Sequence, residues 1–338
     1  MNLHENISLK PYNTFGIDAT AQYFSEITSE NELLDLLIND KVKHLNRFIL
    51  GGGSNILLTK NFDGLVIKNS IKGIKLINED DQYYYVRAGA GVAWHDLVMY
   101  CIDHNYAGIE NMSLIPGCAG ASPIQNIGAY GVEIKDVLFE LEALRIHDCV
   151  FQKFNLSECK FGYRESVFKN ELKGKYIITS ITLRLNRIPK LNTSYGAIEK
   201  ELEIMGVKEL SIKAVSQAVI NIRSSKLPDP FKIGNAGSFF KNPEITAQQF
   251  EDLKKQFPEI VAFPQKNGNV KLAAGWLIEQ CGWKGKTVGN AGVHKNQALV
   301  LVNYGNATGK EIWDLSQQIL DSVKNKFSVD LEREVNVV

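Results

Sequence analysis

Two glycine-rich loops in the first half of the chain limit its possible folds more than any other feature. Gly51, Gly52 and Gly53 directly follow the apolar run at 47–50, so the first loop should begin where a strand ends. Glycine lacks a Cβ and accepts positive φ, and successive backbone N–H groups in such a loop can surround a pyrophosphate. The second loop, at 115–131, is rich in small residues and has no charged side chain, which suits contact with a flat heteroaromatic ring. Together the loops predict an extended bound cofactor.

The first loop does not match the fingerprint of a dinucleotide-binding βαβ unit. Read as G-x-G-x-x-G, it gives Gly51, Gly53 and then Ile56, so the third glycine is missing. Another apolar run follows at 56–58 where a helix should begin, and the acidic residue that would bind a ribose is not found at the required spacing. We therefore do not expect an NAD-binding fold of that type. A tight turn without a ligand remains open for this loop taken alone.

Apolar periodicity predicts an α+β protein. Short or alternating apolar runs bounded by turn residues predict strands at 47–50, 64–67, 83–87, 139–146 and 176–183, and a terminal strand at 329–338. Apolar residues at three-and-four spacing predict helices at 92–104 and 214–222. Two capping boxes, Thr246 with Gln249 and Thr308 with Glu311, predict the starts of two further helices. The glycine-rich half should give way to the helix-containing half between 190 and 230.

Composition restricts the partners and the compartment. The 38 basic and 38 acidic residues balance, so neither nucleic acid nor an anionic membrane is expected as a partner. A chain of 338 residues is too long for one ordinary core and predicts two or three packed units. Five scattered cysteines without a C-x-x-C pair predict reduced thiols, and the start of the chain lacks the apolar segment of a signal peptide. We therefore expect a cytoplasmic protein.

Metal and hydrolase sites are not indicated by any motif. The six histidines form neither an H-x-x-x-H nor an H-E-x-x-H arrangement. The sequence also has no G-x-S-x-G elbow, and no G-K-[ST] follows a glycine run. We expect no bound metal.

Seven motifs in a fixed order make the chain recognisable, although each alone is weak. They are Asn13-Thr-Phe-Gly16, Leu50-Gly-Gly-Gly-Ser-Asn55, Ile115-Pro-Gly117 with Ser122-Pro-Ile-Gln-Asn-Ile-Gly-Ala-Tyr-Gly131, Phe161-Gly-Tyr-Arg-Glu-Ser166, Lys226-Leu-Pro-Asp-Pro230, Gly234-Asn-Ala-Gly-Ser-Phe-Phe-Lys-Asn-Pro243 and Leu272-Ala-Ala-Gly-Trp-Leu-Ile278. Together they closely resemble the UDP-N-acetylenolpyruvoylglucosamine reductase family of peptidoglycan precursor synthesis. The resemblance extends over residues 13–335, nearly the whole chain. The loop at 194–196 resembles the one that marks the family's longer subclass.

The resemblance implies a vanillyl-alcohol-oxidase-type FAD-binding half of two subdomains and a C-terminal α+β substrate-binding domain. The expected domains are residues 1–70, with the terminal strand 328–338 nearby, then 71–215, and finally 216–327. The implied reaction is reduction of the enolpyruvyl group of UDP-N-acetylglucosamine enolpyruvate to UDP-N-acetylmuramate. It would use non-covalent FAD and NADPH as reductant.

Three residues are implied as catalytic. Such a reduction needs a fixed cation on the substrate carboxylate and a proton donor. Arg164 matches the family's cation, since a guanidinium fork holds a carboxylate in bidentate fashion and stays charged. Ser238 matches the proton donor, and a glutamate of the last strand assists protonation. By residue type alone, Arg164 could equally be a surface arginine paired with an acid, and Ser238 a turn or cap residue.

The choice of glutamate stays open on the residue pattern alone. Glu332 and Glu334 are two residues apart and would share one face of a strand. The family match selects Glu334, because its glutamate directly precedes a valine. The segment also departs from the family pattern: Arg333 replaces the usual proline, and Asn336 replaces a common basic residue.

The resemblance also implies binding residues, each of which could otherwise be an ordinary loop or surface residue. Cofactor contacts are expected from Gly51, Gly52, Gly53, Ser54, Asn55, Pro116, Gly117, Ser122, Gln125, Asn126, Gly128 and Arg223. Substrate contacts are expected from Tyr163, Tyr195, Lys226, Asn242, Lys284 and Gln297. Tyr195 and Lys226 resemble the groups that hold the UDP pyrophosphate, and Asn242 and Gln297 resemble uridine contacts. Lys284 resembles a phosphate or nicotinamide-nucleotide contact.

Two other functions remain as alternatives. One is an FAD-linked oxidase of an alcohol or hydroxy acid on the same fold, for which Cys118 would be the nearby residue able to tether a flavin. The other is a flavin- or nucleotide-binding module without catalysis, which the joint presence of Arg164, Ser238 and Glu334 opposes. We expect small-molecule substrates, a UDP-sugar and NADPH, and a monomer.

Overall fold

The structure, a computed structural model, describes residues 2–338 and divides into two compact units. The second unit comprises Ser8–Thr20, Gly53–Asn61 and Lys226–Val338. The first comprises the N-terminal segment up to Ile7, Ala21–Gly52 and Phe62–Ser225. The chain thus changes unit inside the first glycine loop, after Gly52. The predicted division into three domains stays a prediction.

The first unit begins with a four-stranded sheet in the order β1-β2-β5-β3, whose pairs β2–β5 and β5–β3 are parallel. Its strands are β1 (Leu3–Ser8), β2 (Thr20–Ile27), β5 (Phe62–Asn69) and β3 (Arg47–Leu50). Helix α1 (Glu30–Leu37) begins at Ser29, whose hydroxyl accepts a hydrogen bond from the Glu32 N–H at 3.2 Å. Leu33 and Leu36 of α1 pack in one core cluster with Leu65 of β5. Strand β3 therefore ends beside a packed hydrophobic core, and the first glycine loop begins there.

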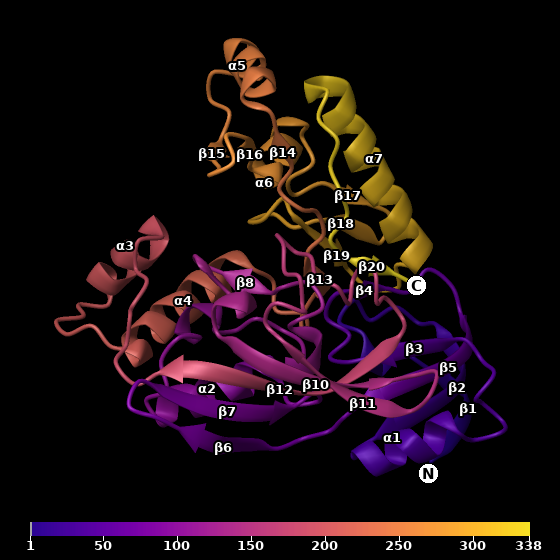
Figure 1. Cartoon of the computed structure of the whole chain (residues 1–338). Helices are drawn as coiled ribbons and strands as arrows, with labels where there is room; N and C mark the ends of the chain where they lie inside the picture. Colours follow the sequence, from indigo (N-terminus) through magenta and orange to yellow (C-terminus); the bar gives the residue numbers. More distant parts are fainter. Residues whose placement is uncertain (1) are drawn as a thin grey trace. The chain divides into compact units, whose positions relative to one another are not determined.

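A five-stranded antiparallel sheet forms the larger part of the first unit (Figure 1). In spatial order its strands are β11 (Val150–Asn155), β10 (Leu138–Arg145), β12 (Tyr176–Asn186), β7 (Tyr83–Gly89) and β6 (Ile74–Glu79). Helix α2 (Trp94–Asp103) buries Trp94, Leu97, Val98 and Cys101 in the core cluster of this sheet. Two further helices, α3 (Gly196–Ile204) and α4 (Ile212–Lys226), pack together through a separate apolar cluster.

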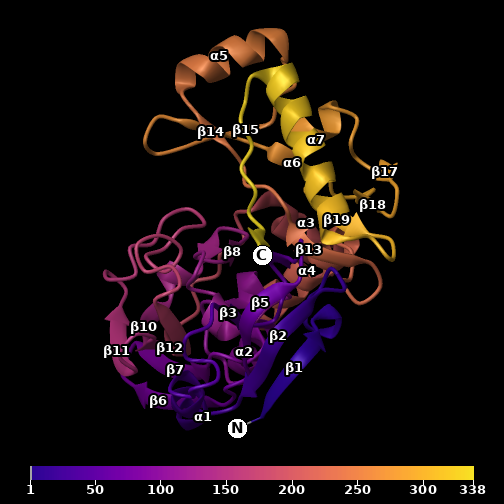
Figure 2. The same ribbon diagram turned by 90° about the vertical axis from the view of Figure 1, so that its right-hand side faces the viewer.

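The second unit contains the sheet β13-β19-β18-β17, alongside which the long helix α7 runs (Figures 1 and 2). These elements are β13 (Gly234–Ser238), β19 (Val300–Asn303), β18 (Ala291–Val293), β17 (Thr287–Val288) and α7 (Gly309–Phe327). A smaller sheet and two helices complete the unit: β14 (Glu244–Ile245), β16 (Val270–Leu272), β15 (Ala262–Pro264), α5 (Ala247–Gln256) and α6 (Ala274–Gln280). Strand β20 (Asn336–Val337) pairs in parallel with β4 (Ile56–Leu57).

Most of the predicted elements are confirmed. The strands at 47–50, 64–67, 83–87, 139–146 and 176–183 correspond to β3, β5, β7, β10 and β12, and the helices at 92–104 and 214–222 to α2 and α4. Both capping boxes are formed, at the starts of α5 and α7. The terminal strand at 329–338 was wrong in extent: only Asn336–Val337 is a strand, with an isolated bridge at Arg333. In the described part of the chain, no helix combines the length and apolar character needed to cross a bilayer.

A buried carboxyl gives a first prediction, on stability and pH. Glu110 is 3% exposed, and its Oε2 accepts a hydrogen bond from the Gly108 N–H at 2.7 Å. Burial raises the pKa of the Glu110 carboxyl, opposed by backbone hydrogen bonds. The folded state therefore holds this proton more tightly than the unfolded chain, and stability is lost as pH rises above the carboxyl's ordinary value. Glu110→Gln removes the charge and keeps an acceptor.

We expect Glu110→Gln to raise the Tm by a few degrees at pH 8 and to give no gain at pH 4.5 or below. Thermal unfolding followed at both pH values tests this. An equal shift at both pH values, or a loss at pH 8, would show that the carboxyl charge does not limit stability.

Candidate active site

The two glycine loops touch within the first unit. A Cβ placed on Gly52 would lie 2.8 Å from the Gly117 Cα, closer than real contacts allow. A Cβ on Gly51 would instead make ordinary contacts with Cys118 and Ala121, at 3.7 and 3.8 Å. Lys68 donates from Nζ to the Gly51 carbonyl at 2.5 Å and fixes the loop from the other side. The loops therefore approach backbone to backbone, as the prediction of one extended cofactor requires.

Gly52→Ala should destabilise the protein without bound cofactor by about 1–3 kcal/mol, the usual cost of forcing an extra methyl group into a packed site. Gly51→Ala, the matched control, should leave the Tm of the same preparation close to wild type. Thermal unfolding of the two variants measures the difference. Equal Tm values for both variants would mean that the contact between Gly52 and Gly117 is not needed for folding.

In the second unit, the remainder of the first loop is tied to the strand that carries Ser238. Gly53 has φ +64°, and a Cβ there would lie 2.0 Å from the Tyr12 carbonyl oxygen. The Thr14 N–H donates to the Gly53 carbonyl at 3.0 Å, and its hydroxyl donates to the Asn235 carbonyl at 2.6 Å. The Asn235 Oδ1 in turn accepts from the Gly237 N–H at 3.0 Å. The motif at 13–16 was recognisable in the sequence, but its connecting role was not.

Ser238 and Glu334 lie on neighbouring segments of the second unit. Ser238 ends β13, and the Glu334 N–H donates to the carbonyl of the next residue, Phe239, at 2.8 Å. Phe240 and Arg333 form an antiparallel bridge, and the Lys241 N–H donates to the Glu332 carbonyl at 2.9 Å. The structure therefore brings the predicted proton donor and the last segment of the chain together.

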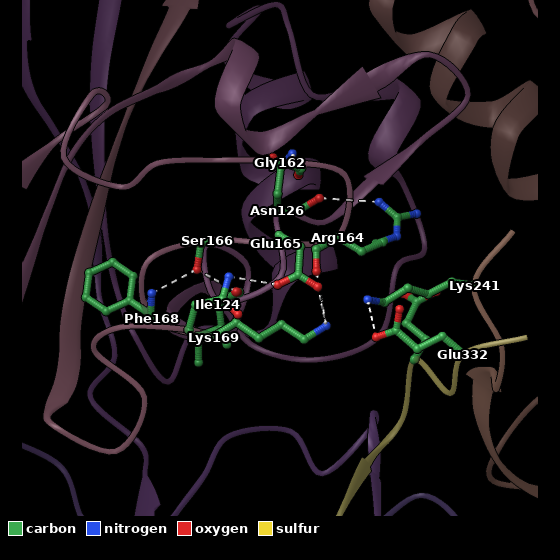
Figure 3. A network of polar contacts seen from close by, with 12 residues as sticks. Ile124, Asn126, Gly162, Arg164, Glu165, Ser166, Phe168, Lys169, Lys241 and Glu332 are labelled. Atoms are coloured by element: carbon green, nitrogen blue, oxygen red, sulfur yellow. Dashed lines mark hydrogen bonds and ion pairs between the residues drawn. The ribbon is translucent and has the colours of Figure 1, made fainter. Parts of the chain in front are cut away.

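Glu332 and Glu334 have different surroundings within this last segment of the chain. The Glu332 side chain is 70% exposed, and its Oε1 lies 2.6 Å from Nζ of Lys241 in an ion pair (Figure 3). The Lys241 side chain is only 9% exposed. Glu334 is half-buried, beside Phe239. The Glu332 carboxylate is thus engaged by a nearly buried lysine, which leaves Glu334 as the better candidate for chemistry.

The two departures from the family pattern have structural explanations. The Arg333 guanidinium stacks over the Trp313 ring at 3.7 Å, and its Nε donates to the Ser316 hydroxyl at 2.8 Å. Burial lowers the pKa of Arg333. This arginine therefore anchors the segment carrying Glu334 to helix α7. Asn336 donates to the Asn55 carbonyl from both its N–H and Nδ2, each at 3.1 Å, and closes the end of the first glycine loop.

Arg164 occupies a backbone conformation that arginine seldom adopts. It lies in a tight turn closed by Gly162 and Glu165, whose N–H and C=O groups bond to each other at 3.0 and 3.3 Å. Its φ is +56°, in the left-handed region that costs a side chain about 1–3 kcal/mol. The guanidinium donates to the Asn126 carbonyl at 3.3 Å (Figure 3) and to the Gly128 carbonyl at 2.9 Å. Strain of this kind persists where the surroundings enforce it, which is frequent at functional sites.

Arg223 is a half-buried cation whose Nε atom is itself buried and unsatisfied. In the chain as described by the structure, its Nε is buried and has no hydrogen-bond partner. Burial lowers the pKa of Arg223, and the nearby Tyr130 acts in the opposite direction. Since a buried charge is costly unless it is paired, the position fits an anionic or electron-rich group of a bound molecule. Together with the approach of Gly52 to Gly117, it supports a site for a large phosphorylated cofactor.

The other expected cofactor contacts lie in the second loop or next to the first. Pro116 is exposed, whereas Gly117, Gln125 and Gly128 are half-buried and Ser122 is buried. The Ser122 hydroxyl donates to the Ala119 carbonyl at 2.6 Å, within its own turn. Ser54 and Asn55 follow Gly53, and the Asn55 Nδ2 donates to the Glu334 carbonyl at 3.4 Å.

The expected substrate contacts fall into groups. Asn242 and Gln297 each lie near the start of α6: the Asn242 Oδ1 accepts from the Ala274 N–H at 3.0 Å, and a Cβ on Gly275 would lie 3.3 Å from the Gln297 Oε1. Lys284 forms an ion pair with Glu279 at 2.8 Å.

Three further expected substrate contacts belong to exposed parts of other elements. Tyr195 is 52% exposed at the start of α3 and meets the Tyr130 ring edge-on at 5.5 Å. Lys226 is exposed at the end of α4, and Tyr163 is 36% exposed next to Arg164.

Comparison with known proteins is consistent across sequence and structure. Residues 229–338 match the family described as "UDP-N-acetylenolpyruvoylglucosamine reductase, C-terminal domain", and residues 21–148 match "FAD binding domain". Relatives named UDP-N-acetylenolpyruvoylglucosamine reductase from Amoebophilus asiaticus and Flavobacterium johnsoniae are 54% and 52% identical, and each alignment covers 100% of both chains.

Solved structures support the expected fold. The UDP-N-acetylenolpyruvylglucosamine reductase of Thermus caldophilus aligns with a TM-score of 0.68 at 24% identity, over 100% of this chain and 99% of that one. p-Cresol methylhydroxylase with substrate bound aligns with a TM-score of 0.52 at 12% identity, over 97% and 85% of the two chains. The predicted α+β fold, with a vanillyl-alcohol-oxidase-type FAD-binding part and a C-terminal α+β domain, is therefore confirmed.

Proposed function

This chain belongs to the UDP-N-acetylenolpyruvoylglucosamine reductase family, and we propose that it reduces the enolpyruvyl group of UDP-N-acetylglucosamine enolpyruvate to UDP-N-acetylmuramate in peptidoglycan precursor synthesis. FAD is the bound cofactor and NADPH the reductant. The observation that carries this proposal is 54% identity along the entire chain to a relative of that name. We further propose a cytoplasmic monomer, a view that the balanced charge and the free cysteines support.

FAD fits the groups that the protein offers. The backbone approach of Gly52 to Gly117 leaves no room for side chains between the loops, and Arg223 supplies a half-buried cation with a buried Nε. Gly51, Gly52, Gly53, Ser54 and Asn55 would hold the pyrophosphate, and Pro116, Gly117, Ser122, Gln125 and Gly128 would line the flavin. When bound, FAD supplies hydride transfer from NADPH to the alkene.

Arg164 would bind the substrate carboxylate. Addition of hydride to the terminal vinyl carbon pushes negative charge onto the neighbouring carbon and into the carboxylate. A guanidinium fork stabilises that charge without exchanging protons, and it gains most in the transition state. The two bonds from Arg164 to the carbonyls of Asn126 and Gly128 keep the fork in one orientation before substrate arrives.

Ser238 would then deliver a proton to the carbon adjacent to the carboxylate. A serine hydroxyl is a weak acid, so the step needs a second group that relays or stabilises the proton. We assign that assistance to Glu334, whose backbone is bonded to Phe239, the residue after Ser238. The Thr14–Asn235 connection described above would hold Ser238 in register with the cofactor loop.

The sugar nucleotide would be held by the remaining expected residues. Asn242 and Gln297, which each lie near the start of α6, would contact the uridine. Tyr195 and Lys226 would contact the pyrophosphate, with Lys284 as a further phosphate or nicotinamide-nucleotide contact. Tyr163 would bind substrate directly or support Arg164, whose Cζ lies 5.5 Å from the centre of the Tyr163 ring.

An FAD-linked oxidase on the same fold is the alternative, and it is not favoured. Such enzymes often tether flavin through a nearby side chain, for which Cys118 was the candidate. Cys118 is buried, and burial raises the pKa of its thiol, against the influence of Lys68 and Lys72. A neutral buried thiol is a poor nucleophile for such a link.

An anaerobic absorbance experiment on the purified protein tests the proposal. NADPH should bleach the visible band of oxidised flavin, and UDP-N-acetylglucosamine enolpyruvate should then restore it. Denaturation should release the flavin, since the link is non-covalent. A protein that bleaches but does not recover would retain the cofactor and refute the substrate. A protein that cannot be loaded with FAD would refute the whole proposal.

A further inference from the structure

We propose that Asn126 is a positioning residue for Arg164 and not a ligand of the cofactor, an inference that rests on the proposed function. The family resemblance placed Asn126 among the flavin contacts. Its surroundings in the first unit indicate that its side chain instead holds the turn from which Arg164 projects. Its effect on catalysis would therefore be confined to the step that uses the arginine.

The side chain of Asn126 is fully committed to protein partners. Asn126 is 0% exposed, and its Nδ2 donates to the Gly162 carbonyl at 2.9 Å and to Oε2 of Glu133 at 3.1 Å. Its Oδ1 accepts a hydrogen bond from the Lys135 N–H at 3.2 Å. An amide nitrogen has two hydrogens to donate, and both are used here. The Asn126 side chain therefore has no donor left for a flavin.

The same residue holds Arg164 at two points. Gly162, which accepts from the Asn126 amide, is the first residue of the turn that contains Arg164. The Asn126 backbone carbonyl accepts a hydrogen bond from the Arg164 guanidinium Nη1 at 3.3 Å (Figure 3). Asn126 itself has φ +44°, a conformation that asparagine tolerates better than most residues. One buried residue thus fixes both the backbone origin and the charged end of the arginine.

The two contacts from Asn126 matter because the Arg164 backbone is strained. A left-handed arginine returns to an ordinary conformation unless its neighbours prevent it, because relaxation relieves the strain of its positive φ. Ser166 and Lys169 add further bonds to the turn, from Oγ to the Ile124 carbonyl at 2.6 Å and from Nζ to the Arg164 carbonyl at 3.1 Å. These two bonds would keep the turn folded when Asn126 is altered, while the guanidinium loses its fixed direction. A displacement of about 1 Å at such a group can cost about 100-fold in rate.

Asn126→Asp and Asn126→Ala test the inference in the FAD-loaded enzyme. Asn126→Asp keeps the size but replaces the donor to Gly162 with an oxygen and sets a second charge beside Glu133. We expect reoxidation of the reduced enzyme by the enolpyruvyl substrate to slow by about 10- to 100-fold in both variants. Reduction of the flavin by NADPH and the affinity for FAD should stay within about twofold of wild type, because neither depends on Arg164.

Ligand binding gives a readout that does not depend on turnover. UDP-N-acetylmuramate carries the carboxylate that Arg164 would hold, whereas UDP-N-acetylglucosamine lacks it. Calorimetric titration should show weaker binding of the first ligand to Asn126→Ala and unchanged binding of the second. Adding Asn126→Ala to an Arg164→Ala variant should cause almost no further loss, since a positioning residue acts only through its target.

Asn69→Ala is the matched structural control. Asn69 is an equally buried asparagine of the same unit, 4% exposed, with bonds to the Ile178 carbonyl and the Ile71 N–H at 2.9 and 3.2 Å. Its loss should lower the Tm about as much while sparing both half-reactions. The inference is overturned by equal losses in both half-reactions of the Asn126 variants, by a weaker affinity for FAD, or by additive losses in the double variant. A wild-type enzyme that is never reoxidised by the substrate would overturn the proposed function, and the inference with it.

Discussion

Arg164→Asn should slow reoxidation of the reduced enzyme by the enolpyruvyl substrate by about 100- to 1,000-fold, while leaving the Tm essentially unchanged. The loss in rate follows from removal of the cation that would stabilise charge on the substrate carboxylate. The Tm should hold because asparagine tolerates a φ of +56° better than arginine does, which offsets the two lost hydrogen bonds to Asn126 and Gly128. Stopped-flow absorbance and thermal unfolding measure the two effects.

Arg164→Lys is the control for charge. Lysine keeps the positive charge but lacks the planar fork, so we expect an intermediate rate and weakened carboxylate binding. Flavin reduction by NADPH should be unaffected in both variants. If Arg164→Asn instead unfolded the protein, or slowed both half-reactions alike, the arginine would be a structural residue of its turn and the assigned role would be wrong.

Local patterns predicted the elements that local interactions determine. The capping boxes at Thr246 and Thr308 were readable because both partners lie within one turn of the helix. The strand at 139–146 was readable because alternation with a period of two directly reflects the faces of a sheet. Helix α1 was missed because it spans only Glu30–Leu37, and α6 because Gly275 interrupts its pattern of helix-forming residues.

The features that could not be predicted depend on contacts between residues far apart in the sequence. The terminal segment alternates like a strand, but its backbone partners are Phe239, Lys241 and β4, far away in the chain, and only Asn336–Val337 completes a strand pair. The choice between the two glutamates likewise depended on an ion pair that spans 91 positions, from Lys241 to Glu332. No local signal marks such a contact.

In the candidate site, too, some features could be predicted from local sequence and others could not. The glycine loops were found from composition, because only glycine permits the approach of Gly52 to Gly117. The burial of the Arg223 Nε and the full use of the Asn126 side chain could not be predicted from the sequence, since both depend on residues from several separate segments. Family motifs named Arg164 but gave no hint of its left-handed backbone, which is the feature that makes its role testable by stability as well as rate.

Glu334→Gln should lower kcat by about 100- to 10,000-fold, whereas Glu332→Gln should change it less than about twofold. The two substitutions remove the same charge two positions apart in one segment, so each controls for the other. Glu334 is half-buried, and its backbone is bonded to the residue after Ser238, where loss of a group that assists protonation would be felt directly. Glu332 is 70% exposed and pairs with Lys241, whose side chain is 9% exposed, so its loss should lower stability more than kcat.

Steady-state kinetics with the enolpyruvyl substrate and single-turnover reduction by NADPH separate the possible outcomes. In Glu334→Gln, reduction of the flavin should proceed at the wild-type rate, and only the step that protonates the substrate should fail. A large loss in Glu332→Gln with normal activity in Glu334→Gln would reverse the assignment and make the Lys241–Glu332 pair the catalytic one. Equal and small losses in both variants would leave protonation to Ser238 without a carboxylate, because neither glutamate would then take part in it.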